Sequence, residues 1–248
     1  MAIVAVGDIH GNLPALLDIL EQVSDVVTHA DAVVFLGDYI DRGPDSKECV
    51  DALLAFRDER RCRVVYLCGN HEDWMLRTRL DYKRHSWLMG MDAFATIRSY
   101  AADAERTLRD AMSEAGLQLY VRRTALPYDA FFTAMPAEHG AFFDNLEPSF
   151  EEDGCFCSHA GVDPRVTILA DQKVDAMLWG DERFPDGYRG DATIVYGHWN
   201  NAVRDDAGWP APSIVGNTIG IDTIFHGVLT ALRVPDRRIF QSKRHRAS

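Results

Sequence analysis

The sequence predicts an α/β protein that begins with a parallel β-sheet covered by helices. Short apolar segments at residues 3–6, 32–36 and 63–67 predict buried strands, and amphipathic segments between them predict helices. This β-α-β-α-β alternation is typical of a parallel sheet with helices on its faces. Polar residues follow each predicted strand, at the edge of the sheet where ligands bind in such folds.

The first helix is expected to open at Asn12 and Pro14, because asparagine suits an N-cap and proline suits the first turn. The residues predicted to form its apolar stripe are four leucines: Leu13, Leu16, Leu17 and Leu20. A second helix is expected at residues 47–59, after Asp45 and Ser46.

Residues 73–147 have few strand signals and are interpreted as a helical insertion that covers one side of the site. The helices expected in and beside it span residues 72–80, 92–102, 104–115 and 137–146. Strands are expected again at residues 155–157, 192–196, 213–215, 219–221, and in a hairpin of residues 228–234 and 238–241. We expect the 248 residues to form a single catalytic domain.

Composition excludes several classes of function. The net charge of −12 argues against duplex nucleic acid as a partner, and the basic residues 243–246 are interpreted as a solvated end. No apolar segment reaches the length of about 20 residues that spans a bilayer, and the N-terminal residues lack a signal-type pattern. Five cysteines without a C-x-x-C pair suggest reduced thiols, so a soluble cytoplasmic protein is expected.

Five short motifs place oxygen or nitrogen ligands at the ends of predicted strands. They are Gly7-Asp8-Ile9-His10-Gly11, Gly37-Asp38-Tyr39-Ile40-Asp41-Arg42-Gly43, Gly69-Asn70-His71-Glu72, Ser158-His159-Ala160-Gly161 and Tyr196-Gly197-His198. Each motif alone could be a structural turn or a helix cap, but five in succession after strands indicate a metal site. Asp, Asn and His without thiolate suit Mn, Fe, Zn, Co or Ni, and a carboxylate can bridge two ions about 3.5–4 Å apart.

The order of these motifs resembles the calcineurin-like metallophosphoesterases, and within them the phosphoprotein phosphatase branch, above all the bacterial and phage-type serine/threonine protein phosphatases. The resemblance covers residues 3–232. It implies a four-layer αββα sandwich with a helical insertion. It also implies two bound divalent metal ions, and manganese is the metal expected at both positions. The implied metal ligands are Asp8, His10, Asp38, Asn70, His159 and His198, and Asp38 would bridge the ions.

The same resemblance implies that His71 is a general acid oriented by Asp41, and that Arg42 grips the phosphate. Hydroxide held between the ions would then attack phosphorus directly, and His71 would protonate the leaving group. The resemblance also implies a second phosphate-binding arginine, but no motif gives its position directly. Asp181 stands where phage-type relatives often have arginine, so Arg183 is the preferred candidate and Arg189 the alternative.

Two further departures bear on the substrate. Asp222-Thr223-Ile224 replaces the Asp-Thr-Gly of relatives, and Trp199 follows His198 as in symmetrical diadenosine tetraphosphate hydrolases. Asp41 favours the phosphatase branch. The sequence therefore predicts a serine/threonine protein phosphatase, with a symmetrical diadenosine tetraphosphate hydrolase or a general small-molecule phosphatase as alternatives. Histidines outside the motifs are interpreted as surface or helix residues: His29, His85, His139, His226 and His245.

Overall fold

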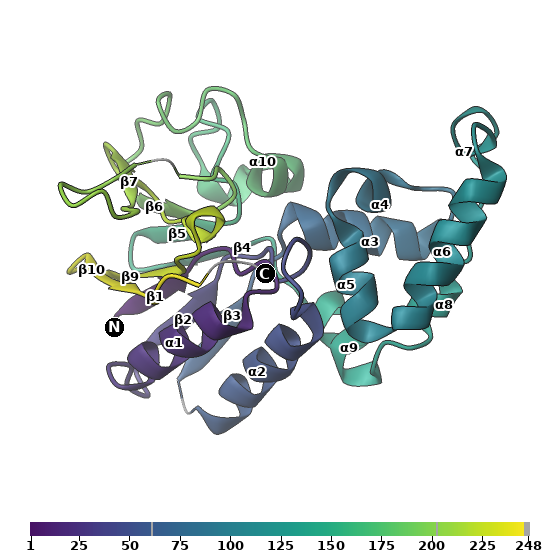
Figure 1. Cartoon of the computed structure of the whole chain (residues 1–248). Helices are drawn as coiled ribbons and strands as arrows, with labels where there is room; N and C mark the ends of the chain where they lie inside the picture. Colours follow the sequence, from purple (N-terminus) through teal and green to yellow (C-terminus); the bar gives the residue numbers. More distant parts are fainter. Residues whose placement is uncertain (61, 202, 246–248) are drawn as a thin grey trace.

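The computed structural model describes residues 1–60, 62–201 and 203–245. Two five-stranded sheets pack against each other, and helices cover their outer faces (Figure 1). The strands are β1 (Ile3–Val6), β2 (Ala32–Phe35), β3 (Arg63–Tyr66), β4 (Ser149–Glu152), β5 (Cys155–Ser158), β6 (Thr193–Tyr196), β7 (Ser213–Val215), β8 (Thr218–Gly220), β9 (Thr230–Val234) and β10 (Arg238–Gln241).

The first sheet has the strand order β10-β9-β1-β2-β3, and the second has the order β4-β5-β6-β8-β7. Strands β1, β2 and β3 are parallel, as predicted, while β9 returns antiparallel to β1. In the second sheet β5, β6 and β8 are parallel, and β4 and β7 run antiparallel at its edges. The central strands of both sheets therefore direct their carboxyl ends to loops that can carry a site.

Alternate residues of each strand face opposite layers. Ile3 and Ala5 of β1 pack against the second sheet, in a core that also contains Cys155 and Cys157 of β5. Val4 and Val6, with the opposite orientation, pack in the core formed with α1 (Leu13–Ser24) and α2 (Ser46–Glu59). On the far face of the second sheet, α10 (Val174–Trp179) covers a third core. These four layers confirm the predicted αββα sandwich.

A group of helices between β3 and β4 forms a separate lobe beside the sandwich (Figure 1). They are α3 (Asn70–Leu80), α4 (Ser86–Gly90), α5 (Ala93–Tyr100), α6 (Ala102–Ala115), α7 (Gln118–Val121), α8 (Asp129–Phe132) and α9 (Ala137–Asp144). Helices α3, α5, α6 and α9 match the four predicted segments within a few residues. The sequence did not indicate the short helices α4, α7 and α8. Among the described residues, no helix is both long and apolar enough to cross a membrane.

Three details differ from the expectations. Leu17 is 51% exposed, and the buried stripe of α1 continues through Ile19 and Val23. His85 is buried at the start of α4 and hydrogen-bonded to Tyr128, so it is not a surface residue, whereas His139 lies in helix α9 and is buried there against Asp51. Strand β4 was not predicted, because only Phe150 of its four residues is buried and the segment shows too little apolar pattern.

Candidate metal centre

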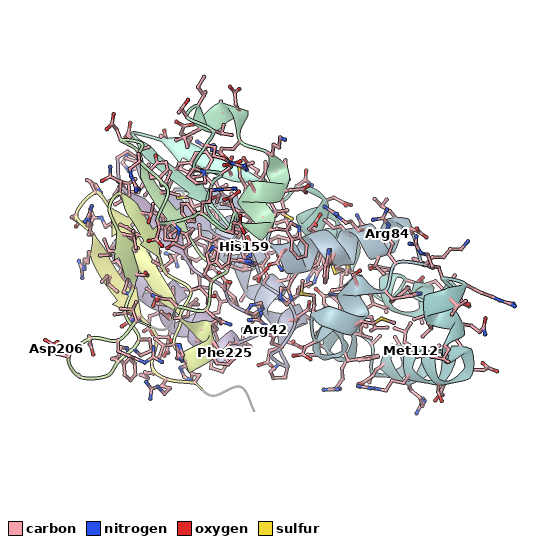
Figure 2. All side chains as sticks on the ribbon, turned by 90° about the horizontal axis from the view of Figure 1, so that it is seen from above. Arg42, Arg84, Met112, His159, Asp206 and Phe225 are labelled. Carbon is pink, nitrogen blue, oxygen red and sulfur yellow. The ribbon has the colours of Figure 1, made fainter. Side chains whose placement is uncertain are left out.

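The predicted ligands come from strand ends of both sheets and meet at one edge of the sandwich. Asp8 follows β1, Asp38 follows β2, Asn70 follows β3, His159 follows β5 and His198 follows β6. Figure 2 places His159 and Arg42 in this region, between the two sheets and the helical lobe. Segments separated by up to 190 residues in sequence therefore converge on one small volume.

Four side chains form the first group of donor atoms. The oxygen Oδ1 of Asn70 lies 3.0 Å from His159 Nε2 and 3.1 Å from His198 Nδ1, and the two ring nitrogens are 3.2 Å apart. Asp38 Oδ1 approaches His159 Nε2 at 3.4 Å. One divalent cation placed among these atoms would be bound by two nitrogens and two oxygens.

Asp38 also faces a second group of donor atoms, which includes His10. Its Oδ2 lies 3.4 Å from Nε2 of His10, whose Nδ1 donates to the carbonyl of Ile40 at 2.9 Å. Because Nδ1 carries the proton, Nε2 presents a lone pair, and this buried atom has no hydrogen-bond partner among the described residues. An orphaned buried nitrogen beside the Asp38 carboxylate fits a bound cation. Asp38 has one oxygen on each side, as a bridging ligand requires.

Burial sets the charges of these groups. It lowers the pKa of His10 and His159, and together with His159 it lowers the pKa of His198 to about 3, so all three rings are neutral ligands near pH 7. Burial and the charges of Asp222 and Asp38 raise the pKa of Asp8. Burial, with the charge of Asp38, also raises the pKa of Asp222 to about 6. Against the effect of burial, the nearby histidines lower the pKa of Asp38, but the pKa values of Asp8 and Asp222 are held above their usual range, and a nearby divalent cation would favour their ionised forms. These residues therefore fit divalent metals.

The backbone is held in an uncommon conformation at this site. Of the ten described non-glycine residues with positive φ, five are site residues: His10, Asp38, Asp41, Arg42 and His198. Glycines allow the close approaches. A Cβ on Gly69 would lie 2.1 Å from Asp38 Oδ1, and a Cβ on Gly197 would lie 2.0 Å from Asp8 Oδ1.

His71 lies beside the metal ligands, with its two ring nitrogens in different surroundings. Its Nδ1 is 2.7 Å from Asp41 Oδ2, while its Nε2 faces Asp38 at 3.7 Å and Arg42 Nη2 at 3.5 Å. Burial lowers the pKa of His71, but the charge of Asp38 and the hydrogen bond with Asp41 outweigh it and raise that pKa to about 9. The ring is therefore protonated near neutral pH, and Nε2–H points into the site.

The helical lobe fixes Asp41. Its carboxylate accepts hydrogen bonds from Trp87 Nε1 at 2.9 Å and Thr96 Oγ1 at 2.5 Å, and its backbone N–H donates to the same Thr96 hydroxyl at 2.8 Å. Trp87 belongs to α4 and Thr96 to α5. Sequence reasoning missed both residues, since they lie about 50 positions from Asp41 and outside every motif.

Glu72 is a second residue without a predicted role. Its buried carboxylate accepts backbone N–H bonds from Asp38 and Gly69 at 2.9 and 3.0 Å, and from Tyr39 and Ile40 at 2.9 and 3.3 Å. It thereby ties the loop after β2 to the start of α3. The sequence signal that could have indicated this role was the position of Glu72 at the end of the Gly69–Glu72 motif.

The candidate second arginine lies apart from this centre. Arg183 is half exposed and pairs with Asp181 at 3.4 Å and Glu182 at 3.6 Å, and Arg189 donates to the carbonyls of Asp186 and Tyr188. None of the described contacts joins either arginine to the metal ligands. Arg42, in contrast, lies at the centre, beside His71.

Comparisons with known proteins identify the family of this chain. The family model of the calcineurin-like phosphoesterases matches residues 1–227. Curated relatives named bis(5'-nucleosyl)-tetraphosphatase PrpE (asymmetrical) include one from Geobacillus thermodenitrificans, 31% identical over 95% of this chain and 91% of its own length. One from Anoxybacillus flavithermus is 27% identical over 93% of this chain and 89% of its own.

Among solved structures, one provisionally named a diadenosine tetraphosphatase covers 97% of this chain and 92% of its own, with a TM-score of 0.60 and 19% identity. A protein serine/threonine phosphatase from Saccharomyces cerevisiae covers 100% of this chain and 81% of its own, with a TM-score of 0.51 and 15% identity. At these identities the two structures support the fold alone.

Glu72→Gln is expected to destabilise the protein, because an amide in place of one carboxylate oxygen faces backbone N–H donors and leaves them unpaired. We expect a loss of about 3 kcal/mol in the free energy of unfolding, measured by denaturant titration with chelator present. The exposed Glu151→Gln on β4 is the matched control and should change stability by less than about 0.5 kcal/mol. Equal stability of the two variants would contradict the anchoring role.

Thr96→Val is expected to disturb the Asp41–His71 pair, because it removes the hydroxyl that bonds both the carboxylate and the backbone of Asp41. We expect kcat on an alkyl phosphate to fall about tenfold, equivalent to one lost hydrogen bond of about 1.4 kcal/mol. Thr96→Ser keeps the hydroxyl and should retain most of the activity. If the serine variant lost as much as the valine variant, packing rather than the hydrogen bond would explain the effect.

Proposed function

Because the chain belongs to the calcineurin-like phosphoesterase family, we propose that it is a metal-dependent hydrolase that cleaves bis(5'-nucleosyl) tetraphosphates asymmetrically, into a nucleoside triphosphate and a nucleoside monophosphate. The observation that carries this proposal is the match to curated relatives of that name along almost the whole chain. It favours the nucleotide alternative over the protein phosphatase predicted from the sequence, and asymmetrical over symmetrical cleavage.

The proposed cofactors are two divalent ions, held by Asp8, His10 and Asp38 on one side and by Asp38, Asn70, His159 and His198 on the other. Such ions activate water near neutral pH and offset charge on phosphate oxygens. Their identity is not fixed by these ligands, and Mn is our choice for assay. We take the whole chain as one catalytic unit.

The chain's own residues orient the substrate and move a proton. The guanidinium of Arg42, close to His71 Nε2, would bind non-bridging oxygens of the attacked phosphate. His71 would hold its proton at Nε2 and deliver it to the leaving oxygen, while Asp41 fixes the ring through Nδ1. Arg183 and Arg189 remain candidates for an outer phosphate contact, since both lie on the loop that precedes β6.

Asp41 was the main reason to expect a protein phosphatase. Its contact with His71 is compatible with both substrates, since an oriented His71 can protonate any leaving group. A serine alkoxide depends strongly on that proton, whereas a polyphosphate ionises near neutral pH and leaves with little help. A serine/threonine protein phosphatase therefore remains the second candidate, supported by the intact His71–Asp41 pair alone.

His71→Asn is expected to separate these leaving groups. Loss of the proton donor should lower kcat on a phosphothreonine peptide by about 10²–10⁴-fold, and on p-nitrophenyl phosphate and diadenosine tetraphosphate much less. Steady-state kinetics of the Mn-loaded variant on the three substrates would measure this. Equal losses on all three would count against His71 as the acid.

The proposed function is tested by incubating Mn-loaded protein with diadenosine tetraphosphate and, separately, with a phosphothreonine peptide. Chromatography of the nucleotide products should show ATP and AMP in equal initial amounts, and chelator-treated protein should give neither. ADP as the sole product would mean symmetrical cleavage. Rapid peptide turnover with an intact dinucleotide would establish the protein phosphatase instead.

A further inference from the structure

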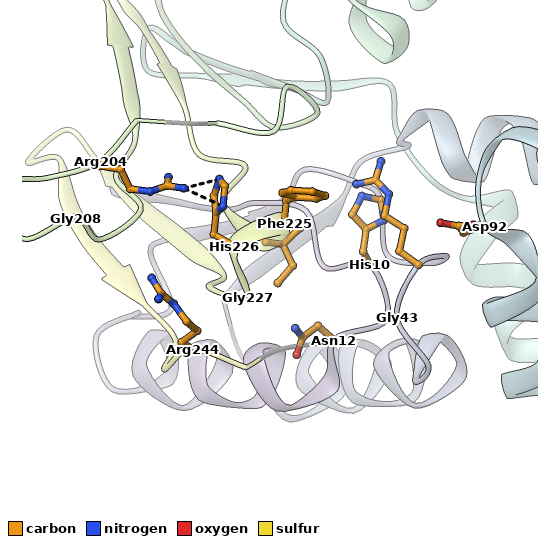
Figure 3. Close-up of a pocket in the computed structure, with 12 residues that line it drawn as sticks. His10, Asn12, Gly43, Asp92, Arg204, Gly208, Phe225, His226, Gly227 and Arg244 are labelled. Atoms are coloured by element: carbon orange, nitrogen blue, oxygen red, sulfur yellow. Dashed lines mark hydrogen bonds between the residues drawn. The ribbon is translucent and has the colours of Figure 1, made fainter. Parts of the chain in front are cut away.

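A cavity of about 650 Å³ opens at the candidate metal centre, and its outer part is not used by the chemistry described above. His10 and Arg42 line its inner end, and Arg204, His226 and Arg244 line its outer part (Figure 3). A nucleotide is small enough to fit in a space of this size, which lies in the usual range for ligand pockets.

The charge of this cavity is opposite to that of the protein. The chain carries a net charge of −12, yet the described lining has three arginines, Arg42, Arg204 and Arg244, and only one acidic residue, Asp92. Such a local excess of guanidinium groups in an acidic protein favours a polyanionic ligand.

Two of these arginines are held in place by neighbouring rings. Arg204 Nη2 lies 3.0 Å from His226 Nδ1, and His226 Nε2 lies 3.1 Å from the carbonyl of Asn201. The Arg244 guanidinium lies over the ring of Trp209, 4.6 Å from its centroid. Both cations are therefore partly pre-oriented on the outer wall.

Phe225 also lines this cavity. It belongs to the 3₁₀ turn η2 (Ile224–His226), and its side chain is 69% exposed. Figure 3 shows its ring on the cavity wall between His226 and His10. A large aromatic side chain kept in water costs hydrophobic free energy without stabilising the fold. An exposed ring in a cavity that arginines also line can serve as a stacking platform for a nucleobase.

We propose that this cavity is the binding site for the nucleotide arm that extends from the attacked phosphate, with the base stacked on Phe225 and the polyphosphate bound by Arg204 and Arg244. This assignment rests on the proposed function and names the residues that select the substrate. It also gives a use to the altered Asp222-Thr223-Ile224 segment, because Phe225 and His226 follow it directly.

The test compares ATP with inorganic tripolyphosphate, which has a similar charge and no base. Calorimetric titration of Mn-loaded protein should show ATP bound about tenfold or more tightly than tripolyphosphate, a typical value for one stacked base. Phe225→Ala should abolish most of this preference, and Phe225→Trp should retain it. Leu117→Ala, at a 77% exposed position beside α7 in the helical lobe, is the matched control for removing an exposed apolar side chain.

Kinetics provide the second measurement. Phe225→Ala should raise KM for diadenosine tetraphosphate about tenfold or more. The same substitution should raise KM for p-nitrophenyl phosphate by a clearly smaller factor. The double variant Arg204→Gln, Arg244→Gln should weaken ATP and tripolyphosphate alike, because it removes phosphate contacts, whereas Arg106→Gln on the lobe should not. Circular dichroism of each variant would verify the fold.

The outcomes separate this proposal from the proposed function. If the wild type prefers ATP through Phe225 but leaves the dinucleotide intact, the nucleotide site stands and the proposed function fails. If the wild type cleaves the dinucleotide while Phe225→Ala changes neither ATP binding nor KM, the site is elsewhere. Equal binding of ATP and tripolyphosphate by the wild type would overturn the proposal. A Phe225→Ala variant with a raised KM for a phosphopeptide but not for the dinucleotide would also overturn it.

Discussion

The carboxylate of Glu72 is the interaction on which the metal centre depends. It accepts four backbone N–H bonds, three from the loop after β2 and one from Gly69 at the start of α3. Those two segments carry Asp38, Asn70 and His71, so one buried side chain sets the relative positions of the proposed bridging ligand, a proposed terminal ligand and the proposed acid. A glutamine in its place would accept at one oxygen only and turn an NH2 group toward the other two donors. The positive φ of Asp38 is tolerated because this network over-determines the loop.

Electrostatics then explain why the folded centre calls for cations. Asp8, Asp38 and Asp222 are buried close together, and the pKa of Asp8 rises through burial and the charges of the other two. The nearby imidazoles cannot neutralise them fully, because burial lowers the pKa of His10 and His159. Bound divalent ions would offset both the carboxylate repulsion and the strained backbone. Metal binding and local stability should therefore be coupled at this edge of the sandwich.

The features of the fold and site that could be predicted from sequence were those that depend on neighbouring residues in the chain. Asp8, Asp38 and Asn70 each stand at the end of a short apolar strand, so their convergence followed from the rule for parallel sheets. The contacts of Asp41 with Trp87 and Thr96 are not local. They depend on how the lobe packs against the sandwich, which no motif encodes. The sequence weighed the substrate by Asp41, which contacts His71 beside the site. The curated relatives favour the nucleotide alternative, and the proposed nucleotide contacts, Phe225, Arg204 and Arg244, lie outside every motif.

Catalysis and substrate choice thus rest on different parts of the fold. The helical lobe approaches the centre from one side and holds Asp41, and through it His71. On another side the η2 turn and the segments bearing Arg204 and Arg244 line the cavity that begins at Arg42. In the proposed function, His71 would reach the leaving oxygen of any phosphate ester, whereas the cavity would contact only a substrate long enough to extend into it. Substitutions in η2 can therefore change which ester is bound without altering how its bond is broken, so the five motifs alone could establish the chemistry but not the substrate.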